Sequence, residues 1–188
     1  MKAKLLPSQE VLRLLYIYEP ETGLLRTRLP RGPWGKQPAG SVIECTRLYH
    51  PSGRPKYCQL DINGEKFYFH RIIWKWMTGD DPPVNVDHDD RDICNNKWNN
   101  LRLATVSENG FNRPMQANNT SGYKGVCFDK ARGLFMAKIT VNKKVINLGR
   151  FITAEDAFTA YQKACIKYHG EFANTGTADD QSESCSAI

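Results

Sequence analysis

Residues 86–112, VDHDDRDICNNKWNNLRLATVSENGFN, decide the local fold at the centre of this chain. A short strand is expected to end at His88, with a polar loop after it and a second strand beginning near Leu101. A helix then begins at Thr105, because T-x-x-E from Thr105 to Glu108 is a capping box, in which the two side chains satisfy otherwise unpaired backbone N–H groups. The predicted order is strand, loop, strand, helix.

Such a unit brings together four polar side chains, those of Asp87, His88, Asn100 and Asn109. The carboxylate of Asp87 and the amide oxygen of Asn109 are ligands that Mg²⁺ and Mn²⁺ favour, and these ions take few ligands from the protein. His88 points away from Asp87 on an extended strand and can take a proton from water, while Asn100 is placed to hold the loop and orient the imidazole. A metal beside a base is the minimum apparatus for hydrolysing a phosphodiester.

Asp, Asn and Gly also populate ordinary solvated loops, so each short motif alone has a purely structural interpretation. The whole pattern in order, D-H, N-N-x-x-x-N-L-R, T-x-x-E-N, resembles the HNH nuclease family, in the subgroup of phage and intron homing endonucleases where Asn replaces the last His. The resemblance covers residues 84–112. It implies that His88 is the general base, Asp87 and Asn109 hold one Mg²⁺ or Mn²⁺, and Asn100 braces a ββα-metal motif.

Charge favours a polyanionic partner. The 188 residues carry a net charge of +6, and residues 175–188 contain three acidic and no basic groups, so the rest of the chain is more basic still. The six cysteines are dispersed without a C-x-x-C pair, so no structural zinc is expected, and a reducing interior suits them. The beginning of the chain has no apolar run typical of a secretory or membrane segment, which predicts a soluble protein of the cytoplasm.

The region 1–80 is expected to form β-hairpins with short helices. A helix passing into a strand is predicted over residues 9–18, a hairpin with strands at 56–62 and 66–70 around Asn63-Gly64, and a helix over 71–78. A basic loop, residues 26–40, is either solvated, with Trp34 packed on the sheet, or an arm along DNA. The candidate phosphate contacts in it are Arg26, Arg28, Arg31 and Lys36.

From residue 121 the pattern changes to short alternating strands, expected at 123–128, 134–141 and 144–148. A helix capped by Thr153 and closed by Gly170 follows, with an apolar stripe that extends to Tyr168. A three-stranded antiparallel sheet backed by one helix leaves one sheet face exposed, and such a face can enter a major groove.

Residues 118–174 resemble the plant Apetala/ethylene-response-factor DNA-binding domain, through Tyr123-Lys124-Gly125-Val126 and the segments around residues 135–139, 148–151 and 153–161. The plant domain has arginines after its Y-[RK]-G-V signature and a Trp at the start of its second strand, where this chain has Cys127, Asp129 and Phe135. The resemblance therefore implies the scaffold and not the base-reading code; a solvated lysine-rich face is the alternative. The candidate phosphate contacts are Lys124, Lys138, Lys143, Lys144 and Arg150.

These patterns predict an α+β chain. Its parts are a β-hairpin region at 1–80, an HNH core at 81–113, a linker at 114–120, an Apetala-like domain at 121–174 and a disordered acidic tail at 175–188.

The leading hypothesis is a homing-type DNA endonuclease of a phage or mobile element in a bacterial host. It would act on double-stranded DNA with one Mg²⁺ or Mn²⁺, leave a 5′-phosphate and a 3′-hydroxyl, and nick one strand per active site as a monomer, with a dimer for double-strand cutting. The alternatives are a DNA-binding regulator with an inactive nuclease fold, and a nuclease acting on RNA or branched DNA, which the lack of an RNP-type stacking motif disfavours.

Overall fold

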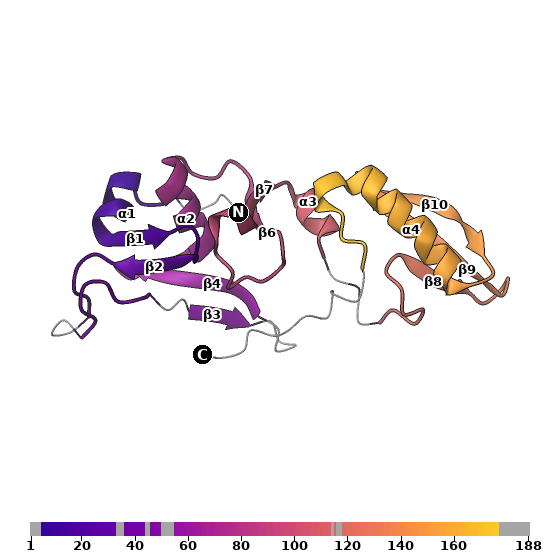
Figure 1. Ribbon diagram of the computed structural model, residues 1–188. Coiled ribbons are helices and arrows are strands. Elements are labelled where there is room, and N and C mark those ends of the chain that lie inside the picture. Colours follow the sequence, from indigo (N-terminus) through magenta and orange to yellow (C-terminus); the bar gives the residue numbers. More distant parts are fainter. Residues whose placement is uncertain are drawn as a thin grey trace. The chain divides into compact units, whose positions relative to one another are not determined.

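The computed structural model describes residues 5–32, 36–43, 46–49, 55–113, 115 and 118–176. Trp34, part of the linker and most of the acidic tail therefore lie outside the described residues. The chain forms two compact units, Met1–Ala104 and Thr105–Ile188, each described here by itself. The expected α+β class is confirmed, with small antiparallel sheets in both units (Figure 1).

The first unit contains three small antiparallel sheets, β1-β2, β3-β4-β5 and β6-β7. Its elements in chain order are α1 (Gln9–Leu15), β1 (Tyr16–Glu19), β2 (Leu24–Thr27), β3 (Thr46–Tyr49), β4 (Pro55–Ile62), β5 (Glu65–Tyr68), α2 (Phe69–Thr78), β6 (Asn85–His88), the short 3-10 helix η2 (Trp98–Asn100) and β7 (Leu101–Ala104). The predicted turn between β4 and β5 is confirmed, since Asn63 and Gly64 have φ of 55° and 81°, as a type I′ turn requires.

Helix α2 is the centre of the core of this unit. Its buried residues Phe69, Ile72 and Ile73 lie three and four positions apart, which places them on one face. The sequence pattern predicts a strand at residues 69 and 70. The helix instead begins at Phe69, because that residue completes the apolar stripe and is buried to 4% exposure.

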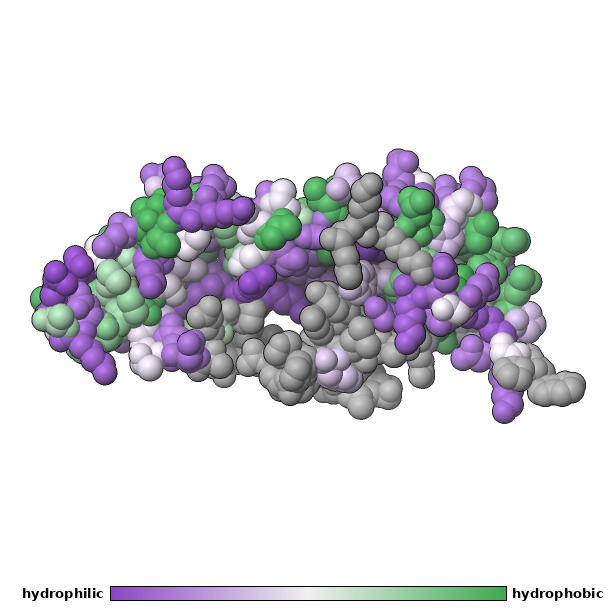
Figure 2. All heavy atoms as spheres, turned by 180° about the vertical axis from the view of Figure 1, so that it is seen from behind, coloured by the Kyte–Doolittle hydropathy of each residue, from purple (hydrophilic) through white to green (hydrophobic). Residues whose placement is uncertain are grey.

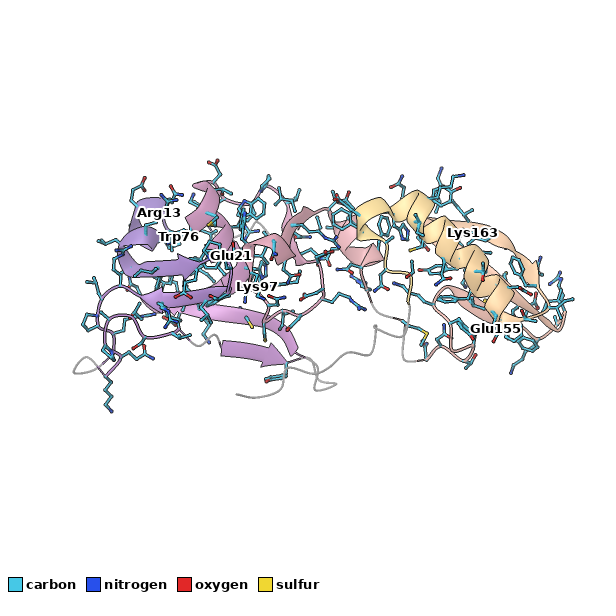
Figure 3. All side chains as sticks on the ribbon, viewed as in Figure 1. Arg13, Glu21, Trp76, Lys97, Glu155 and Lys163 are labelled. Carbon is cyan, nitrogen blue, oxygen red and sulfur yellow. The ribbon has the colours of Figure 1, made fainter. Side chains whose placement is uncertain are left out.

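Helices α1 and α2 are also fastened to each other by polar contacts. The guanidinium of Arg13 lies 4.9 Å from the centre of the Trp76 ring, and its Nε donates a hydrogen bond to the Trp76 carbonyl at 3.3 Å (Figure 3). The side chain of Gln9 donates to the same carbonyl at 2.9 Å. These bonds supply partners for carbonyls near the end of α2, which have none within the helix.

The second unit begins with a short helix and continues into a sheet covered by one long helix. Its elements are α3 (Val106–Phe111), β8 (Val126–Asp129), β9 (Leu134–Val141), β10 (Lys144–Phe151), α4 (Ala154–His169) and the 3-10 helix η3 (Gly170–Phe172). Helix α4 lies along the sheet β10-β9-β8 (Figure 1). Ala137, Ala157 and Cys165 are fully buried between them.

Three details of this unit differ from the sequence prediction. Strand β10, expected at 144–148, continues to Phe151. The first strand begins at Val126 and not at Tyr123, because Gly125 has φ of +74° and its Cα lies against the ring of Tyr161; a Cβ there would meet that ring at 2.1 Å. At the end of α4 the buried residue is His169, whereas Tyr168 is 39% exposed. The buried stripe of α4 thus follows the face turned to the sheet. On that face, His169 Nε2 lies 3.2 Å from the Thr140 carbonyl of β9.

In the described part of the chain, no helix is both long and apolar enough to cross a membrane.

Candidate active site

The candidate site is built on the β6-β7 hairpin, whose register pairs Asp87 with Arg102 and His88 with Leu101. Adjacent residues of an extended strand point to opposite sides. His88 is accordingly buried, at 6% exposure, while the side chain of Asp87 is 12% exposed on the other side. The expected strand, loop, strand and helix, including the capping box of Thr105 and Glu108, are all present.

The imidazole of His88 is oriented by Asn96. The distance from His88 Nε2 to Asn96 Oδ1 is 3.2 Å, and the Nδ2 of Asn96 donates to the Cys94 carbonyl at 3.2 Å, which fixes the direction of the amide. Because an amide oxygen only accepts, Nε2 carries the proton and Nδ1 keeps the lone pair. In this tautomer Nδ1 is the basic nitrogen of His88.

Burial lowers the pKa of His88 below its ordinary value of 6.5, since the interior disfavours the charged imidazolium. The hydrogen bond to Asn96 and the carboxylates of Asp90, Asp87 and Asp92 act in the opposite direction and are outweighed. The lowered pKa keeps the imidazole neutral at pH 7, which is the form a general base requires.

A second histidine, His70, lies next to His88. Its ring meets the His88 ring edge-on at 5.3 Å and stacks on Tyr68 at 5.8 Å. Burial, with a smaller contribution from His88 and Arg71, lowers the pKa of His70 to about 3. His70 thus remains neutral and supports the face of the catalytic candidate by packing.

Asn100 braces the loop between the two strands. Its Oδ1 accepts from the Asp90 backbone N–H at 3.0 Å, and its Nδ2 donates to Asp90 Oδ1 at 2.9 Å and to the Asn95 carbonyl at 2.7 Å. The side chain is buried, at 8% exposure. The sequence pattern also predicted that Asn100 orients the imidazole of His88. The structure provides that contact from Asn96, which belongs to the N-N pair at 95–96 and had not been singled out.

Asp87 is held by a cation from the opposite strand. Arg102 Nη2 lies 3.4 Å from Asp87 Oδ2, and Nη1 of the same guanidinium is paired with Asp89. Within the described residues, no group of three or more His, Cys, Asp and Glu side chains gathers as a metal site. Mg²⁺ and Mn²⁺ favour carboxylate oxygens such as those of Asp87, and they usually take few ligands from the protein.

The other predicted ligand, Asn109, lies in the second unit. It is half-buried on α3, and its backbone N–H donates to the Thr105 carbonyl at 3.0 Å. Its amide oxygen is of the chemical type that fits a hard cation beside a carboxylate.

The first hairpin of the chain supports the loop. Tyr18 Oη donates to the Asn96 carbonyl at 2.7 Å, and the backbone N–H of Trp98 donates to the Pro20 carbonyl at 3.0 Å. Gly23, at φ +75°, lies so close to this loop that a Cβ would meet Lys97 N at 2.6 Å. Glu21 and Lys97 mark the two adjoining segments in Figure 3. The hairpin β1-β2 therefore fixes the backbone of Asn96, the partner of His88.

Three of the four basic residues expected on DNA near the N-terminus have intramolecular partners. Arg26 is paired with Glu19 at 2.5 Å, Arg28 Nε donates to the Arg13 carbonyl at 2.9 Å, and Arg31 donates to the Asp61 carbonyl at 3.1 Å. Lys36 is exposed. The arginines thus contribute to the loop structure, whatever their contact with DNA.

The candidates of the second unit divide in the same way. Lys138, Lys143 and Lys144 are exposed, whereas Arg150 is paired with Asp129 at 3.3 Å and the ammonium of Lys124 donates to backbone carbonyls. Figure 2 shows hydrophilic side chains interrupted by hydrophobic ones on the face it presents.

Comparison with known proteins identifies the same segment. The sequence profile described as HNH endonuclease matches residues 67–111, from β5 through α3. "Protein 3.8" of Escherichia phage T7 is 31% identical over 105 residues, covering 55% of this chain and 86% of the phage protein. The "Uncharacterized HNH endonuclease L560" of Acanthamoeba polyphaga mimivirus is 28% identical over 116 residues, covering 61% of this chain and 59% of the mimivirus protein. No solved structure matches the chain.

Proposed function

We propose that this chain, which belongs to the HNH endonuclease family, is a metal-dependent DNA endonuclease of the homing type. Family membership suggests DNA as the substrate, and the phage relative supports an origin in a phage or a mobile element. The observation that carries the proposal is the pair Asp87 and His88 on β6, with the buried imidazole held by Asn96 so that Nδ1 is its basic atom. This pair lies inside the segment that the family profile matches.

In the proposed reaction, His88 Nδ1 takes a proton from a water molecule, and that water attacks the phosphorus in line with the leaving O3′ oxygen. Asn96 keeps the imidazole in the required tautomer, and Asn100 keeps the loop closed around it. Asp87 and Asn109 would hold one Mg²⁺ or Mn²⁺, which when bound would supply charge stabilisation at the scissile phosphate. The products are a 5′-phosphate and a 3′-hydroxyl. One site per chain implies a nick, and cutting both strands requires a dimer or two binding events.

DNA is held, in this proposal, by charge on both sides of the nuclease segment. The region 1–80 and an Apetala-like domain at 121–174 make the contacts, with a core at 81–113 and a linker at 114–120. Lys36, Lys138, Lys143 and Lys144 are exposed and are the strongest candidates for phosphate contact.

One observation favours the second candidate, a DNA-binding regulator without nuclease activity. The carboxylate expected to bind metal is already paired with Arg102, and in an inactive protein this guanidinium would stay in place of the metal. The two candidates differ in one result: the regulator binds DNA and never cuts it.

The test is incubation of supercoiled plasmid with the purified protein in Mg²⁺ or Mn²⁺, with an EDTA control and end-mapping of the products. Nicked DNA bearing 5′-phosphates, absent in EDTA, is expected. A gel shift without cleavage in either metal would favour the regulator.

A matched pair of variants tests the metal ligand. Asp87→Asn and Asp89→Asn make the same chemical change two residues apart, and both carboxylates contact Arg102. Only Asp87→Asn should raise the Mn²⁺ concentration required for nicking. Equal behaviour of the two variants would refute the assignment of Asp87.

A further inference from the structure

Helix α3 ends in a cluster of backbone carbonyls that share one cation. Lys124 Nζ donates to the carbonyls of Phe111 at 3.3 Å, Arg113 at 2.6 Å and Asn174 at 3.0 Å. An ammonium has three N–H donors, so three acceptors match its capacity. The last carbonyls of a helix have no partner within it, and a cation at that end is electrostatically favourable. Lys124 therefore caps α3 from a distant part of the chain.

Asn174 joins the same segment from the end of the second unit. Its Nδ2 donates to the carbonyls of Asn112 at 3.1 Å and Arg113 at 3.3 Å, and its own carbonyl accepts from Lys124. Asn174 and Asn112 are both buried, at 9% and 7% exposure. Three segments of the second unit are thus tied at one point.

Stacking of two rings fixes the last turn of α3 sideways. The ring of Phe111 lies on the ring of His169 at 3.8 Å between centres, with an angle of 6° between the planes. His169 is itself held, through Nε2, at 3.2 Å from the Thr140 carbonyl of β9. A six-residue helix has little stability of its own. Its position is therefore set by the second unit.

We propose that Lys124 and Asn174 are positioning residues for helix α3 and for Asn109 on it. They form a latch, defined here as Lys124, Asn174 and the carbonyls of residues 111–113, which holds α3 and with it Asn109 on the unit that contains the sheet. The inference rests on the proposed function, because Asn109 is there a metal ligand. It assigns the ammonium of the half-buried Lys124 to the carbonyls at the end of α3, in place of a phosphate of DNA.

The latch predicts a separation of effects that a phosphate contact would not give. Loss of the Lys124 ammonium loosens α3 and weakens metal binding, while metal-free DNA binding keeps its salt dependence. Loss of a lysine that touches a phosphate lowers the slope of log K against log[salt] by about one and leaves α3 unchanged.

The experiment compares Lys124→Met with Lys138→Met in the full chain. Both replace a lysine of the second unit by a long uncharged side chain, and Lys138 is exposed on β9. Three quantities are measured: amide hydrogen exchange of residues 106–112 without metal, the affinity for Mn²⁺ by calorimetry, and the affinity for a DNA duplex in EDTA at several salt concentrations.

For Lys124→Met we expect exchange in α3 to become at least about tenfold faster, Mn²⁺ binding to weaken severalfold, and the salt slope to stay at the wild-type value. Lys138→Met should leave the exchange and Mn²⁺ binding unchanged. If Lys124→Met leaves α3 protected and lowers the salt slope, Lys124 is a phosphate contact and the latch is wrong.

Asn174→Ala provides a second route if Lys124→Met does not fold, which circular dichroism would show. This substitution removes the two hydrogen bonds that the Asn174 side chain donates and leaves the Lys124 ammonium in place. A smaller acceleration of amide exchange in α3 is therefore expected, and unchanged exchange would overturn the latch. Failure of the proposed function looks different, since wild-type protein would then bind no Mn²⁺ and cut no DNA while the exchange results still stood.

Discussion

The β6-β7 hairpin and the β8-β9-β10 sheet use polar residues in opposite ways. In the hairpin region, His88, Asn96 and Asn100 are buried. His88 is hydrogen-bonded to Asn96, and Asn100 donates a hydrogen bond to the Asn95 carbonyl in the same loop. On the sheet, Lys138, Lys143 and Lys144 are exposed. Burying polar groups is costly unless every bond is made, so the hairpin network specifies one geometry. The exposed lysines specify only a charge.

This difference indicates what each region can do. An imidazole held in one orientation suits a chemical step that depends on a fraction of an ångström, whereas a charged surface suits binding that tolerates many positions along a polyanion. Changes in the hairpin should therefore act steeply on cleavage, and changes on the sheet should act gradually on affinity.

The largest effect is expected for His88→Ala. Loss of a general base lowers the cleavage rate by about 10²–10⁴-fold, while DNA binding in EDTA stays close to wild type because the sheet is untouched. Plasmid nicking and a gel shift, measured side by side, check both parts. Cleavage that survives the substitution unchanged would remove His88 from the mechanism.

Gly23→Ala should disrupt the site on the β6-β7 hairpin, although Gly23 belongs to the turn between β1 and β2. A Cβ at Gly23 would meet Lys97 N at 2.6 Å and displace the loop that carries Asn96. Because of this clash and the positive φ of Gly23, we expect the first unit to lose roughly 2–4 kcal/mol of stability. Cleavage should also become slower.

Gly40→Ala is the matched control for that substitution, because Gly40 has φ of +86° and no atom of the described residues lies within 4 Å of an added Cβ. Urea unfolding followed by tryptophan fluorescence reports on the first unit alone, since all four tryptophans precede residue 105. If the two variants lose the same stability and activity, contact with the loop is not the cause.

Acid should weaken the first unit through its buried histidines. The pKa of His70 is about 3 and that of His88 is lowered, so between the folded pKa and about 6.5 the unfolded chain binds more protons than the folded one. The stability contributed by these neutral histidines is fully present above pH 6.5 and is lost as the pH is lowered. For His70 alone, the free energy of unfolding should be lower by about 2 kcal/mol at pH 5.

Urea midpoints at pH 7.5 and 5.0, followed by tryptophan fluorescence, measure that change. His70→Phe keeps an aromatic ring beside Tyr68 and His88 without a titrating group, and should reduce the pH dependence. Midpoints that are equal at the two pH values in wild-type protein would contradict the burial of these imidazoles.

The smallest effect is expected on the sheet. Lys144→Ala should weaken DNA binding only a few-fold and lower the salt slope by about one, with cleavage at saturating protein unchanged. Lys163→Ala, at an exposed position of α4 (Figure 3), is the control and should change neither. An effect of Lys163→Ala as large as that of Lys144→Ala would place DNA on the helix side of the unit.

Local sequence rules were sufficient for several elements. The capping box placed the start of α3, the Asn63-Gly64 pair placed the β4-β5 turn, and alternation placed β9 with Ala137 and Ile139 inside. Each depends on a few neighbouring residues and their backbone geometry, and for that reason a short pattern is enough. The roles of Asp87 and Asn109 as metal ligands remain predictions.

Other features depended on contacts distant in sequence. Helix α2 begins at Phe69 because that ring completes a core stripe, and β8 begins at Val126 because Tyr161 takes the space beside Gly125. Asn96 could not be distinguished from its neighbours in NNKWNN until His88 and Tyr18 were seen to contact it.

By itself, the sequence determined which chemistry this protein can carry: an ordered set of Asp, His and Asn side chains on a strand-loop-strand-helix unit, in a chain of net charge +6. Only the tertiary structure decided which of those side chains are partners. It gave His88 its tautomer through Asn96, paired Asp87 with Arg102, and turned Lys124 inward to three carbonyls. The physical reason is that a residue type fixes its donors, acceptors and charge, whereas packing selects the groups that lie within 3 Å or so of them.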